Sequence, residues 1–437
     1  MSGQGRPLGQ SAEPVEPISG MRVVLDARPL QEPDRAPATA AYLGGLLGAF
    51  DAEPLAGESF AFFLQSDLDD PTTGFDHLAV VGRRLLPPTR LLRSAAMTVD
   101  PFLLRGAALG AAWRAERGGA GGAVYHAAGG STLPLASGLP LVVTLLDLAP
   151  WELAGAFQRT PATRFGQRIR GRLLRDADAV IVGSDAVGAA ARRLLRLRRE
   201  RIRVIPFAPR EAFTLEGPDG AAERERLGLP ERYLVYAGRY DARQDLATLL
   251  RALAELAAAG RPPSLPEEDP WPPRILLAGA SPDDRAALAR AATREHVGDA
   301  LAYAPNLPDA RLAALVRGAR AAILPVLSEA AGFAAIDALA CGTPIVASAV
   351  GALPELVGAA GILVPPREPG RLAAALQTVW TDRRVHARIA GEARARAAGR
   401  RTWAEVAVAT RRVYAEVGAY GRIGQGVGVG VGDGEAV

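Results

Sequence analysis

The sequence predicts two α/β domains, each built on a doubly wound parallel β-sheet. Short runs of wholly apolar residues recur along the chain, as expected of parallel strands that are buried on both faces. Longer amphipathic stretches separate these runs, and such alternation of strands and helices favours parallel sheets covered by helices. A length of 437 residues, with 49% hydrophobic and 22% charged residues, is enough for two or three domains with sizeable cores.

The first set of apolar runs predicts the strands of an N-terminal domain over residues 21–210. These runs are 21–27, 60–64, 123–127, 141–147, 179–184 and 202–207. The segments FAPREAF and LEGPDG follow the last run, and we expect the domain boundary there, between Pro206 and Pro230.

The second set predicts a C-terminal domain over residues 211–400. Its apolar runs are 233–238, 274–279, 300–305, 321–326, 343–350 and 361–365, and its clearest helical patterns are 241–259, 282–295 and 309–319. A proline-rich insert over 261–273 is expected to be a surface loop.

The two ends of the chain differ in composition from the domains. We expect residues 1–20 and 421–437 to be disordered, because the second stretch, GRIGQGVGVGVGDGEAV, is a low-complexity tract with no core-forming pattern. A helix is predicted over 401–420, with its amphipathic pattern between 402 and 417.

Composition excludes several kinds of chemistry. The 51 basic residues are all arginine, so a pyridoxal phosphate Schiff base, a Schiff-base aldolase and the phosphate-binding lysine of a P-loop have no residue to form them. Cys341 is the only cysteine, which excludes an internal disulfide framework and a zinc ribbon. The 4 histidines are scattered without metal-ligand spacing. No G-x-G-x-x-G turn follows the first strand, so a dehydrogenase is not expected.

Charge and hydropathy give expectations about partners and compartment. The net charge of +4 is mild, and the arginine-rich stretches 164–175 and 192–203 lack the interleaved aromatics typical of nucleic-acid binding, which is not expected. These stretches are solvated helix faces or a peripheral contact with an anionic membrane. With no apolar run of membrane-spanning length and no signal-type apolar segment near the start, we expect a cytoplasmic protein.

The most informative segment is SEAAGFAAIDALACGTPIVASAVGALPELV, residues 328–357. It follows a predicted strand, and ligands of parallel sheets bind at the carboxyl ends of strands. Glu329 stands beside small residues that let the backbone approach a ligand, and a helix through Asp337 stops at Gly342. The start of that helix favours anions. One of the two carboxylates could bond sugar hydroxyls and the other ribose hydroxyls.

This segment resembles the signature of the group 1 (family 4) retaining glycosyltransferases of the GT-B fold, E-x7-E followed by A-C-G-T-P. It reads here Glu329-x7-Asp337 and then Ala340-Cys341-Gly342-Thr343-Pro344. The segments MRVVLDARPL, AVIVGSDAV, LVYAGRYDARQDLATLL, GALPELVG and GILVPP are also similar to that family. The resemblance implies two Rossmann-like domains that face each other across a cleft, with the helix 401–420 returning to the first domain.

The resemblance also implies a donor site in the second domain. The family stabilises the departing diphosphate with an Arg and a Lys that follow the first strand of that domain. Arg239 matches the Arg, Gln244 stands in place of the Lys, and Arg243 is a neighbouring cation. Compensation by Arg243 and loss of the cation both stay open. The residues expected to bind the donor are Arg239, Arg243, Gln244, Gly332, Phe333 and Asp337, with Arg239 and Glu329 as the catalytic residues.

In the first domain the chain departs from the family twice. Leu146 stands where the family's V-T-x-H-D-L has its histidine, and the glycine-rich G-x-G-x-Y loop has alanines at 38 and 40, before Tyr42. His126 either faces the cleft or is a satisfied structural histidine, and Trp151 either stacks on a sugar or belongs to the core. The residues expected in the cleft or at the acceptor are Tyr42, His126, Asp147 and Trp151.

The prediction from these residues is a metal-independent, retaining hexosyltransferase (EC 2.4). Its substrate would be a nucleotide-sugar, and neither a cofactor nor a metal is expected. The acceptor stays open among a polysaccharide, a lipid-linked sugar and a small molecule. The alternative is a catalytically degenerate protein of the same fold that binds a nucleotide-sugar or a partner glycosyltransferase without turnover, as the changes at Leu146 and Gln244 suggest.

Overall fold

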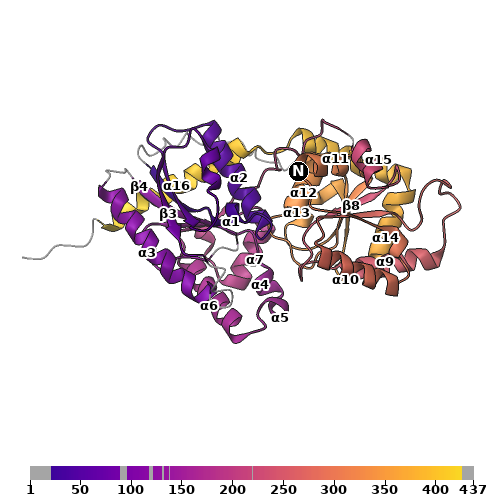
Figure 1. The fold of residues 1–437 in the computed structure, drawn as a ribbon, viewed down its shortest axis with the longest axis horizontal. Helices are drawn as coiled ribbons and strands as arrows, with labels where there is room; N and C mark the ends of the chain where they lie inside the picture. The colour runs from indigo at the N-terminus through magenta and orange to yellow at the C-terminus, as the bar shows by residue number, and fades with distance from the viewer. Residues whose placement is uncertain are drawn as a thin grey trace, which may run out of the picture.

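Two parallel β-sheets form two lobes of the protein (Figure 1). The structure, a computed structural model, describes residues 21–88, 96–117, 122–129, 132–136, 138–218 and 220–425. The prediction of two doubly wound α/β domains is confirmed. The stretches 1–20 and 426–437, expected to be disordered tails, lie outside the described residues.

The first sheet has the strand order β3-β2-β1-β4-β5-β6-β7, and all its pairs are parallel. Its strands are β1 Met21–Asp26, β2 Ser59–Gln65, β3 Val80–Leu86, β4 Gly122–Ala128, β5 Leu141–Thr144, β6 Ala179–Val182 and β7 Ile202–Val204. The order reverses between β1 and β4, where a crevice for ligands is expected at the carboxyl ends of the strands.

The second sheet has the order β10-β9-β8-β11-β12-β13, again parallel throughout. Its strands are β8 Leu234–Ala237, β9 Ile275–Ala278, β10 Leu301–Ala304, β11 Ala321–Leu324, β12 Ile345–Ser348 and β13 Gly361–Val364. Here the order reverses between β8 and β11, so the loops that follow these two strands border the second crevice.

Helices cover both faces of each sheet. Those of the first half are α1 Arg28–Gln31, α2 Pro37–Ala52, α3 Ala96–Arg117, α4 Ala149–Glu152, α5 Ala154–Phe157, α6 Pro161–Asp176 and α7 Asp185–Leu195. Those that follow are α8 Ala221–Arg226, α9 Leu246–Ala259, α10 Pro282–Arg294, α11 Asp309–Gly318, α12 Phe333–Ala340, α13 Leu353–Val357, α14 Pro369–Thr381, α15 Arg383–Ala398 and α16 Trp403–Gln425.

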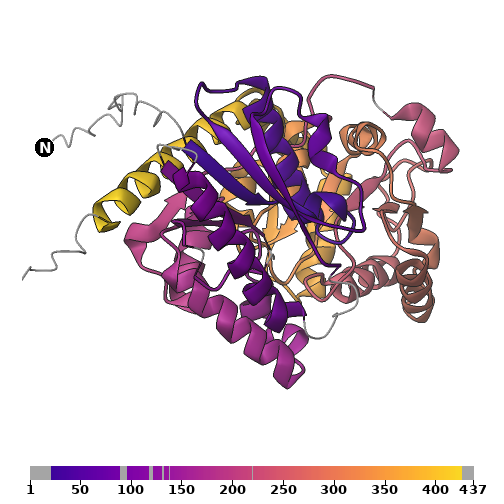
Figure 2. The same cartoon turned by 60° about the vertical axis from the view of Figure 1, so that its left-hand side comes forward.

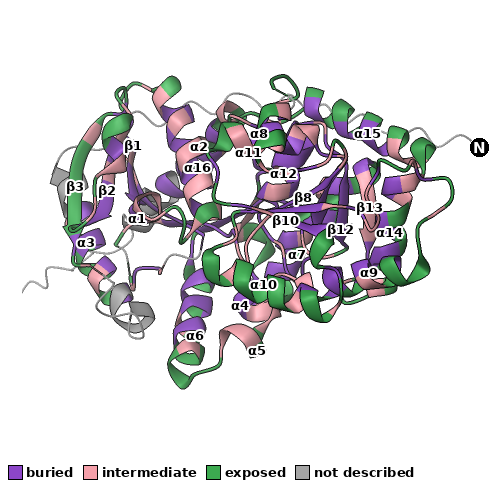
Figure 3. Cartoon of the chain, turned by 45° about the vertical axis from the view of Figure 1, so that its right-hand side comes forward, coloured by how far each residue is buried: buried purple, intermediate pink, exposed green. Residues whose placement is uncertain are grey.

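Successive strand residues point to opposite faces and so enter separate cores. Val23 and Leu25 of β1 lie in the core under α2 and α16, whereas Val24 lies in the core under α3, α6 and α7. In the second sheet, Val235 packs towards α11 and α12, and Leu234 packs towards α9 and α14. Figure 3 shows the buried strands between helices whose outer faces are exposed.

Three local expectations were wrong. Strand β3 was missed because most of its residues are exposed, as suits the edge of a sheet. The helix expected from 241 begins at Leu246, since the Asp241 carboxylate accepts the backbone N–H of Arg243 at 2.9 Å and favours a turn. Helix α16 continues to Gln425, so residues 421–425 are helical and not part of a disordered tail.

Helix α16 lies along the first domain, against α2, β4 and β5, although it follows the second domain in sequence (Figures 1 and 2). Its first residue, Trp403, joins an aromatic cluster that we call the junction rings: Tyr42, Phe207, Phe333 and Trp403. Phe333 stacks on Phe207 with ring centroids 5.7 Å apart and on Trp403 at 6.4 Å. Trp403 also donates its Nε1–H to the carbonyl of Pro209 at 2.8 Å. The junction rings therefore tie both domains and the returning helix together.

The contact between α2 and Trp403 gives a prediction on stability. A Cβ atom at Gly45 would overlap the Trp403 ring, whereas one at Gly48, on the same helix, would meet nothing within 4 Å. Gly45→Ala should lower the free energy of unfolding by about 1–3 kcal/mol, the usual effect of overpacking. Gly48→Ala should leave it unchanged or raise it by up to about 1 kcal/mol, because alanine favours a helix. Urea unfolding of the two variants measures both, and equal stability of the two would contradict the packing described.

Candidate functional site

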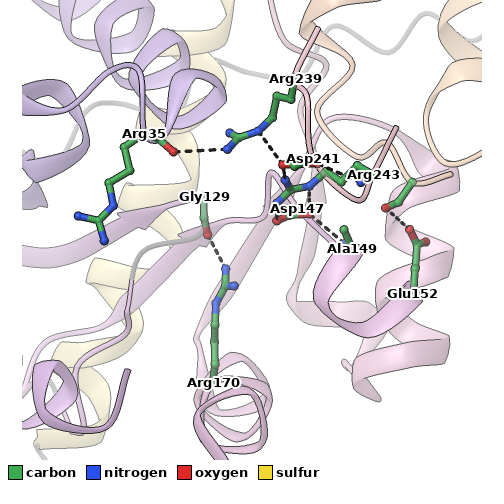
Figure 4. Close-up of polar contacts among 10 residues, drawn as sticks. Arg35, Gly129, Asp147, Ala149, Glu152, Arg170, Arg239, Asp241 and Arg243 are labelled. Carbon is green, nitrogen blue, oxygen red and sulfur yellow. Dashed lines mark hydrogen bonds and ion pairs between the residues drawn. The ribbon is translucent and has the colours of Figure 1, made fainter. Parts of the chain in front are cut away.

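The carboxyl ends of strands from both sheets meet at the domain junction. Arg239 follows β8 and Glu329 follows β11, so both border the point where the strand order of the second sheet reverses. Asp147 follows β5 of the first sheet and reaches Arg243 of the second domain. Strand topology thus brings charged residues from both domains to one place (Figure 4).

A chain of ion pairs runs through this place. Arg243 Nη2 lies 2.5 Å from Asp147 Oδ2, and Arg243 Nη1 pairs with the carboxylate of Asp241. Arg239 Nε lies 3.0 Å from Oδ2 of the same Asp241. Asp147 is itself held in place, because its Oδ1 accepts the backbone N–H of Ala149 at 2.9 Å. Figure 4 shows Arg243 between the two aspartates.

Arg239 and Arg243 differ in their exposure and in the number of carboxylates that they contact. The side chain of Arg243 is 19% exposed, and that of Arg239 is 38% exposed. Burial alone would lower the pKa of Arg243, but the hydrogen bond to Asp147 and the charges of Asp147, Asp241 and Glu329 raise it overall, so the guanidinium stays charged. Arg239 has a charge-assisted bond to one carboxylate only and reaches towards the carbonyl of Arg35 in the first domain, at 3.5 Å. Arg239 is therefore the more available cation.

Glu329 holds the start of α12. Its Oε1 accepts the backbone N–H of Gly332 at 2.8 Å, and Gly332 has a positive φ of 73°. A Cβ atom at Gly332 would overlap Leu356, so this position requires glycine. Burial raises the pKa of Glu329, as does the charge of Asp147, while the bond from Gly332 and the charge of Arg243 oppose the rise. The carboxylate thus lies near both Asp147 and Arg243.

Asp337 is engaged within the protein. Its carboxylate accepts the backbone N–H of Arg210 at 2.9 Å and lies 2.8 Å from Arg210 Nε. Burial raises the pKa of Asp337 to about 6, although Arg210 opposes that shift. A ribose contact would require Arg210 to give up this pairing.

Two residues of the expected donor region, Phe333 and Gln244, and Leu146 of the first domain have side-chain atoms buried in the protein. Phe333 belongs to the junction rings, and Leu146 is 5% exposed within the first-domain core. Gln244 is not on a helix: it pairs as an isolated antiparallel bridge with Val326, and its Oε1 is buried with no hydrogen-bond partner in the described part of the chain. A helical rotation therefore does not relate Arg243 to Gln244.

Two residues expected at the acceptor are core residues instead. Tyr42 and His126 are fully buried, and α16 closes over them. The hydroxyl of Thr144 donates to Tyr42 Oη at 2.9 Å, so His126 Nε2 donates to Thr144 Oγ1 at 2.8 Å and its Nδ1 accepts from Tyr414 at 2.6 Å. The alanines of the expected glycine loop lie in the first turns of α2. Both ring nitrogens of His126 are therefore bonded to buried residues of the chain.

The structure also adds residues that the sequence reading missed. Arg170 lies over the Trp151 ring at 5.3 Å, and its Nη2 donates to the carbonyl of Gly129, after β4, at 2.6 Å. Asp241 and Arg210 were missed because acidic and basic residues are common in loops and only their partners distinguish them. Within the described residues there is no group of three or more His, Cys, Asp or Glu side chains that could hold a metal ion.

Comparison with known protein families gives a match within the second domain. Residues 231–382 match the family described as glycosyl transferases group 1. A D-inositol 3-phosphate glycosyltransferase of Streptomyces bingchenggensis is 36% identical over 209 residues, 45% of this chain and 43% of that protein. The chain spans about half the length of the curated relatives it matches.

Solved structures with a similar fold cover both domains of this chain. Sucrose-phosphate synthase from Thermosynechococcus elongatus has a TM-score of 0.66 at 22% identity, over 92% of this chain and all (100%) of that one. Anabaena HepE, in complex with UDP and glucose, has a TM-score of 0.64 at 19% identity, over 91% of this chain and 99% of that one. The expected GT-B architecture of two Rossmann-like domains is confirmed, and so is the resemblance to group 1 glycosyltransferases.

The buried histidine gives a prediction on pH dependence. Burial lowers the pKa of His126 from 6.5 to about 3. Because the unfolded chain binds the proton more readily, His126 contributes stability that is fully present above pH ~6.5 and is lost as the pH falls towards 3. His126→Gln should therefore flatten the fall in the free energy of unfolding between pH 6.5 and 4 by up to about 1.4 kcal/mol per pH unit.

His77→Gln is the matched control, since His77 has a side chain that is 71% exposed. Its stability should follow the wild-type pH dependence, measured by urea unfolding at several pH values. A pH profile of His126→Gln parallel to the wild type would show that His126 is not held neutral.

Proposed function

We propose that the protein, whose second domain belongs to the group 1 glycosyltransferases, transfers a hexose from a nucleotide-sugar to an acceptor with retention of configuration. The observation that carries this proposal is the meeting of Arg239 and Arg243 of the second domain with Asp147 of the first, beside Glu329. Such a junction can hold a diphosphate on one side and an acceptor on the other. The likeness in fold to HepE, described in complex with UDP and glucose, supports a nucleotide donor.

Arg239 is the residue best suited to the diphosphate. It is the more exposed of the two arginines, and a guanidinium can bind phosphate oxygens with two hydrogen bonds. Arg243 is shared between Asp147 and Asp241, so a diphosphate must compete with these carboxylates for it. Arg239 would therefore supply most of the charge that stabilises the leaving group.

Glu329 is suited to the sugar. A carboxylate near the start of a helix and in a loop of small residues can accept hydrogen bonds from hydroxyls that its apolar neighbours cannot bond. Gly332 allows the backbone of this loop to adopt a positive φ. Asp337 pairs with Arg210 and so fixes the position of that guanidinium.

A binding protein without turnover is the second candidate. Leu146 and Gln244 stand where the family has a histidine and a lysine; Leu146 is buried, and so is the side-chain oxygen of Gln244. Asp147 and Asp241 already offset the charges of Arg239 and Arg243 before a diphosphate enters. These observations favour weakened catalysis.

We also propose a peripheral contact with an anionic membrane. One side of α6 exposes Arg164, Phe165, Arg168, Arg172 and Arg175, a basic stripe with one aromatic residue. In the described residues no helix is both long and apolar enough to cross a membrane. Co-sedimentation with vesicles containing anionic lipid tests this contact, and absence of binding at low salt would refute it.

The role of Glu329 can be separated from that of the diphosphate site. Glu329→Ala should weaken nucleotide-sugar binding by about 1–3 kcal/mol, the range for a hydrogen bond to a charged group, and should leave binding of the free nucleoside diphosphate almost unchanged. Calorimetry with both ligands measures this difference. Glu392→Ala, an exposed carboxylate of α15, is the control and should match the wild type. Equal affinity of the wild type and Glu329→Ala for the nucleotide-sugar would remove Glu329 from the site.

The role of Arg239 decides between enzyme and binder. If the protein turns over a nucleotide-sugar, Arg239→Ala should reduce the turnover rate about 10²–10³-fold. This is the usual effect of removing one hydrogen-bond donor from a developing anion. Arg243→Ala should reduce it less, because Arg243 is already paired, and Arg251→Ala, an exposed arginine of α9, should not reduce it. Gln244→Arg should raise turnover or leave it unchanged.

Two outcomes would overturn this assignment. Equal turnover of the wild type and Arg239→Ala would show that the diphosphate site lies elsewhere. No turnover by the wild type, together with turnover by the double variant Gln244→Arg and Leu146→His, would identify a degenerate binder.

A further inference from the structure

The loop that follows β11, residues 325–332, carries Glu329 and is held by hydrogen bonds within the second domain. The carbonyl of Arg243 accepts the backbone N–H of Leu327 at 2.6 Å, and the carbonyl of Glu329 accepts that of Ala352 at 3.0 Å. Both bonds join parts of the second domain, so they do not depend on where the first domain lies.

Ser328, directly before Glu329, makes a hydrogen bond to the first domain. Its hydroxyl donates to Glu152 Oε2 at 2.5 Å, a length typical of a charge-assisted O–H···O⁻ bond. Ser328 is only 2% exposed, and a buried hydroxyl that loses its partner raises the free energy of the folded state. The Glu152 carboxylate is therefore the group that fixes the Ser328 side chain, and it can do so only while the first domain lies against this loop.

One short segment of the first domain reaches two loops of the second. Asp147 pairs with Arg243, on the loop after β8, at 2.5 Å, and its Oδ1 accepts the N–H of Ala149 at the start of α4. Glu152 ends the same helix and bonds to the loop after β11. The guanidinium of Arg243 also lies over the Phe157 ring of α5, 5.0 Å from its centroid. This segment thus touches both loops that border the second crevice (Figure 4).

We infer that Glu152 is a positioning residue for the sugar: by fixing Ser328 it orients the loop that carries Glu329. The inference rests on the proposed hexosyl transfer, in which Glu329 contacts the sugar. Because Ser328 and Glu329 are neighbours in the chain, a rotation of the Ser328 backbone would move the Glu329 carboxylate directly. The sugar site is therefore complete only when α4 lies on the loop. Arg239 lies on the other loop, after β8, so binding of a diphosphate does not require Glu152.

Glu152 acts here as a hydrogen-bond acceptor, and its charge is not needed for that. The carboxylate of glutamate and the side-chain carbonyl of glutamine both accept a bond from a hydroxyl, whereas leucine has no acceptor. Glu152→Gln should therefore keep the loop in place, and Glu152→Leu should release it. Ser328→Ala removes the donor and should have the same effect as Glu152→Leu.

The first test compares the binding of UDP-glucose with that of UDP, by calorimetry on the full chain. Glu152→Leu and Ser328→Ala should each weaken UDP-glucose binding roughly three- to tenfold and change UDP binding less than about twofold. Glu152→Gln should bind both ligands as the wild type does. The double variant of Glu152→Leu and Ser328→Ala should lose no more affinity than either single variant, because both remove the same bond.

Asn306→Ala is the matched control. Asn306 Nδ2 donates to Asp34 Oδ1 at 3.0 Å, which is also a bond between the domains, but Asn306 lies on the loop after β10. If any contact between the domains had the same effect, Asn306→Ala would weaken UDP-glucose binding as Glu152→Leu does. We expect it to bind UDP-glucose as the wild type does. The melting temperature of each variant shows that it is folded.

A second measurement needs no ligand. Glu329 Oε1 accepts the backbone N–H of Gly332 at 2.8 Å, so hydrogen exchange of the Gly332 amide reports whether the loop is in place. Exchange should be faster in Glu152→Leu and Ser328→Ala than in the wild type. In Glu152→Gln and Asn306→Ala it should match the wild type.

Four outcomes would overturn the inference. They are equal affinity of the wild type and Glu152→Leu for UDP-glucose, equal weakening of UDP-glucose and UDP binding in that variant, a loss in Glu152→Gln as large as in Glu152→Leu, and unchanged exchange at Gly332. The proposed transfer stands in all four if the wild type binds UDP-glucose. If the wild type does not bind it, exchange at Gly332 decides the inference alone. Faster exchange in Glu152→Leu then keeps Glu152 as the residue that positions the loop, and only the proposed use of this donor fails.

Discussion

The junction rings determine how the two sheets face each other. Phe207 comes from the chain that leaves the first domain, Phe333 opens α12 and Trp403 opens the returning helix, so three separate segments meet in one stack. Phe333 directly follows Gly332, whose N–H is bonded to Glu329. A shift of the rings would therefore move the loop that carries Glu329, so the arrangement of the candidate site depends on this apolar packing as well as on its ion pairs.

Within that frame the charged groups of the site are already paired. Arg243 bridges to Asp147 across the domains, and a half-buried ion pair of this kind adds little net stability, because desolvation offsets the attraction. A diphosphate that enters would exchange one anionic partner of the arginine for another. The free-energy cost of desolvating Arg243 arises during folding and not on binding. The affinity for a diphosphate therefore depends on how much more strongly the guanidinium interacts with phosphate than with carboxylate. A chain without lysine can in this way keep a cation at the site without leaving it unpaired.

The sequence predicted what depends on local pattern and failed where distant segments meet. Apolar runs located the buried strands, and the motif around Glu329 located the loop after β11, because strand ends in a doubly wound sheet share one edge. The exposed edge strand β3 has no apolar run to reveal it. Tyr42 and His126 looked accessible because nothing near them in sequence covers them, whereas Tyr414, 288 positions beyond His126, closes the pocket. The roles proposed for Arg239, Glu329 and Asp337 stay predictions, since position alone does not define a role.

Hydrogen-bond satisfaction separates the polar residues of this protein better than residue type does. His126, Tyr42 and Asp337 belong to the types that suggest chemistry, yet each has its bonds completed by other residues of the chain. Gln167 is an unremarkable residue on an arginine-rich helix, yet its buried oxygen is unbonded in the described residues. An unbonded buried atom lowers stability, and protein interiors rarely keep one without a use.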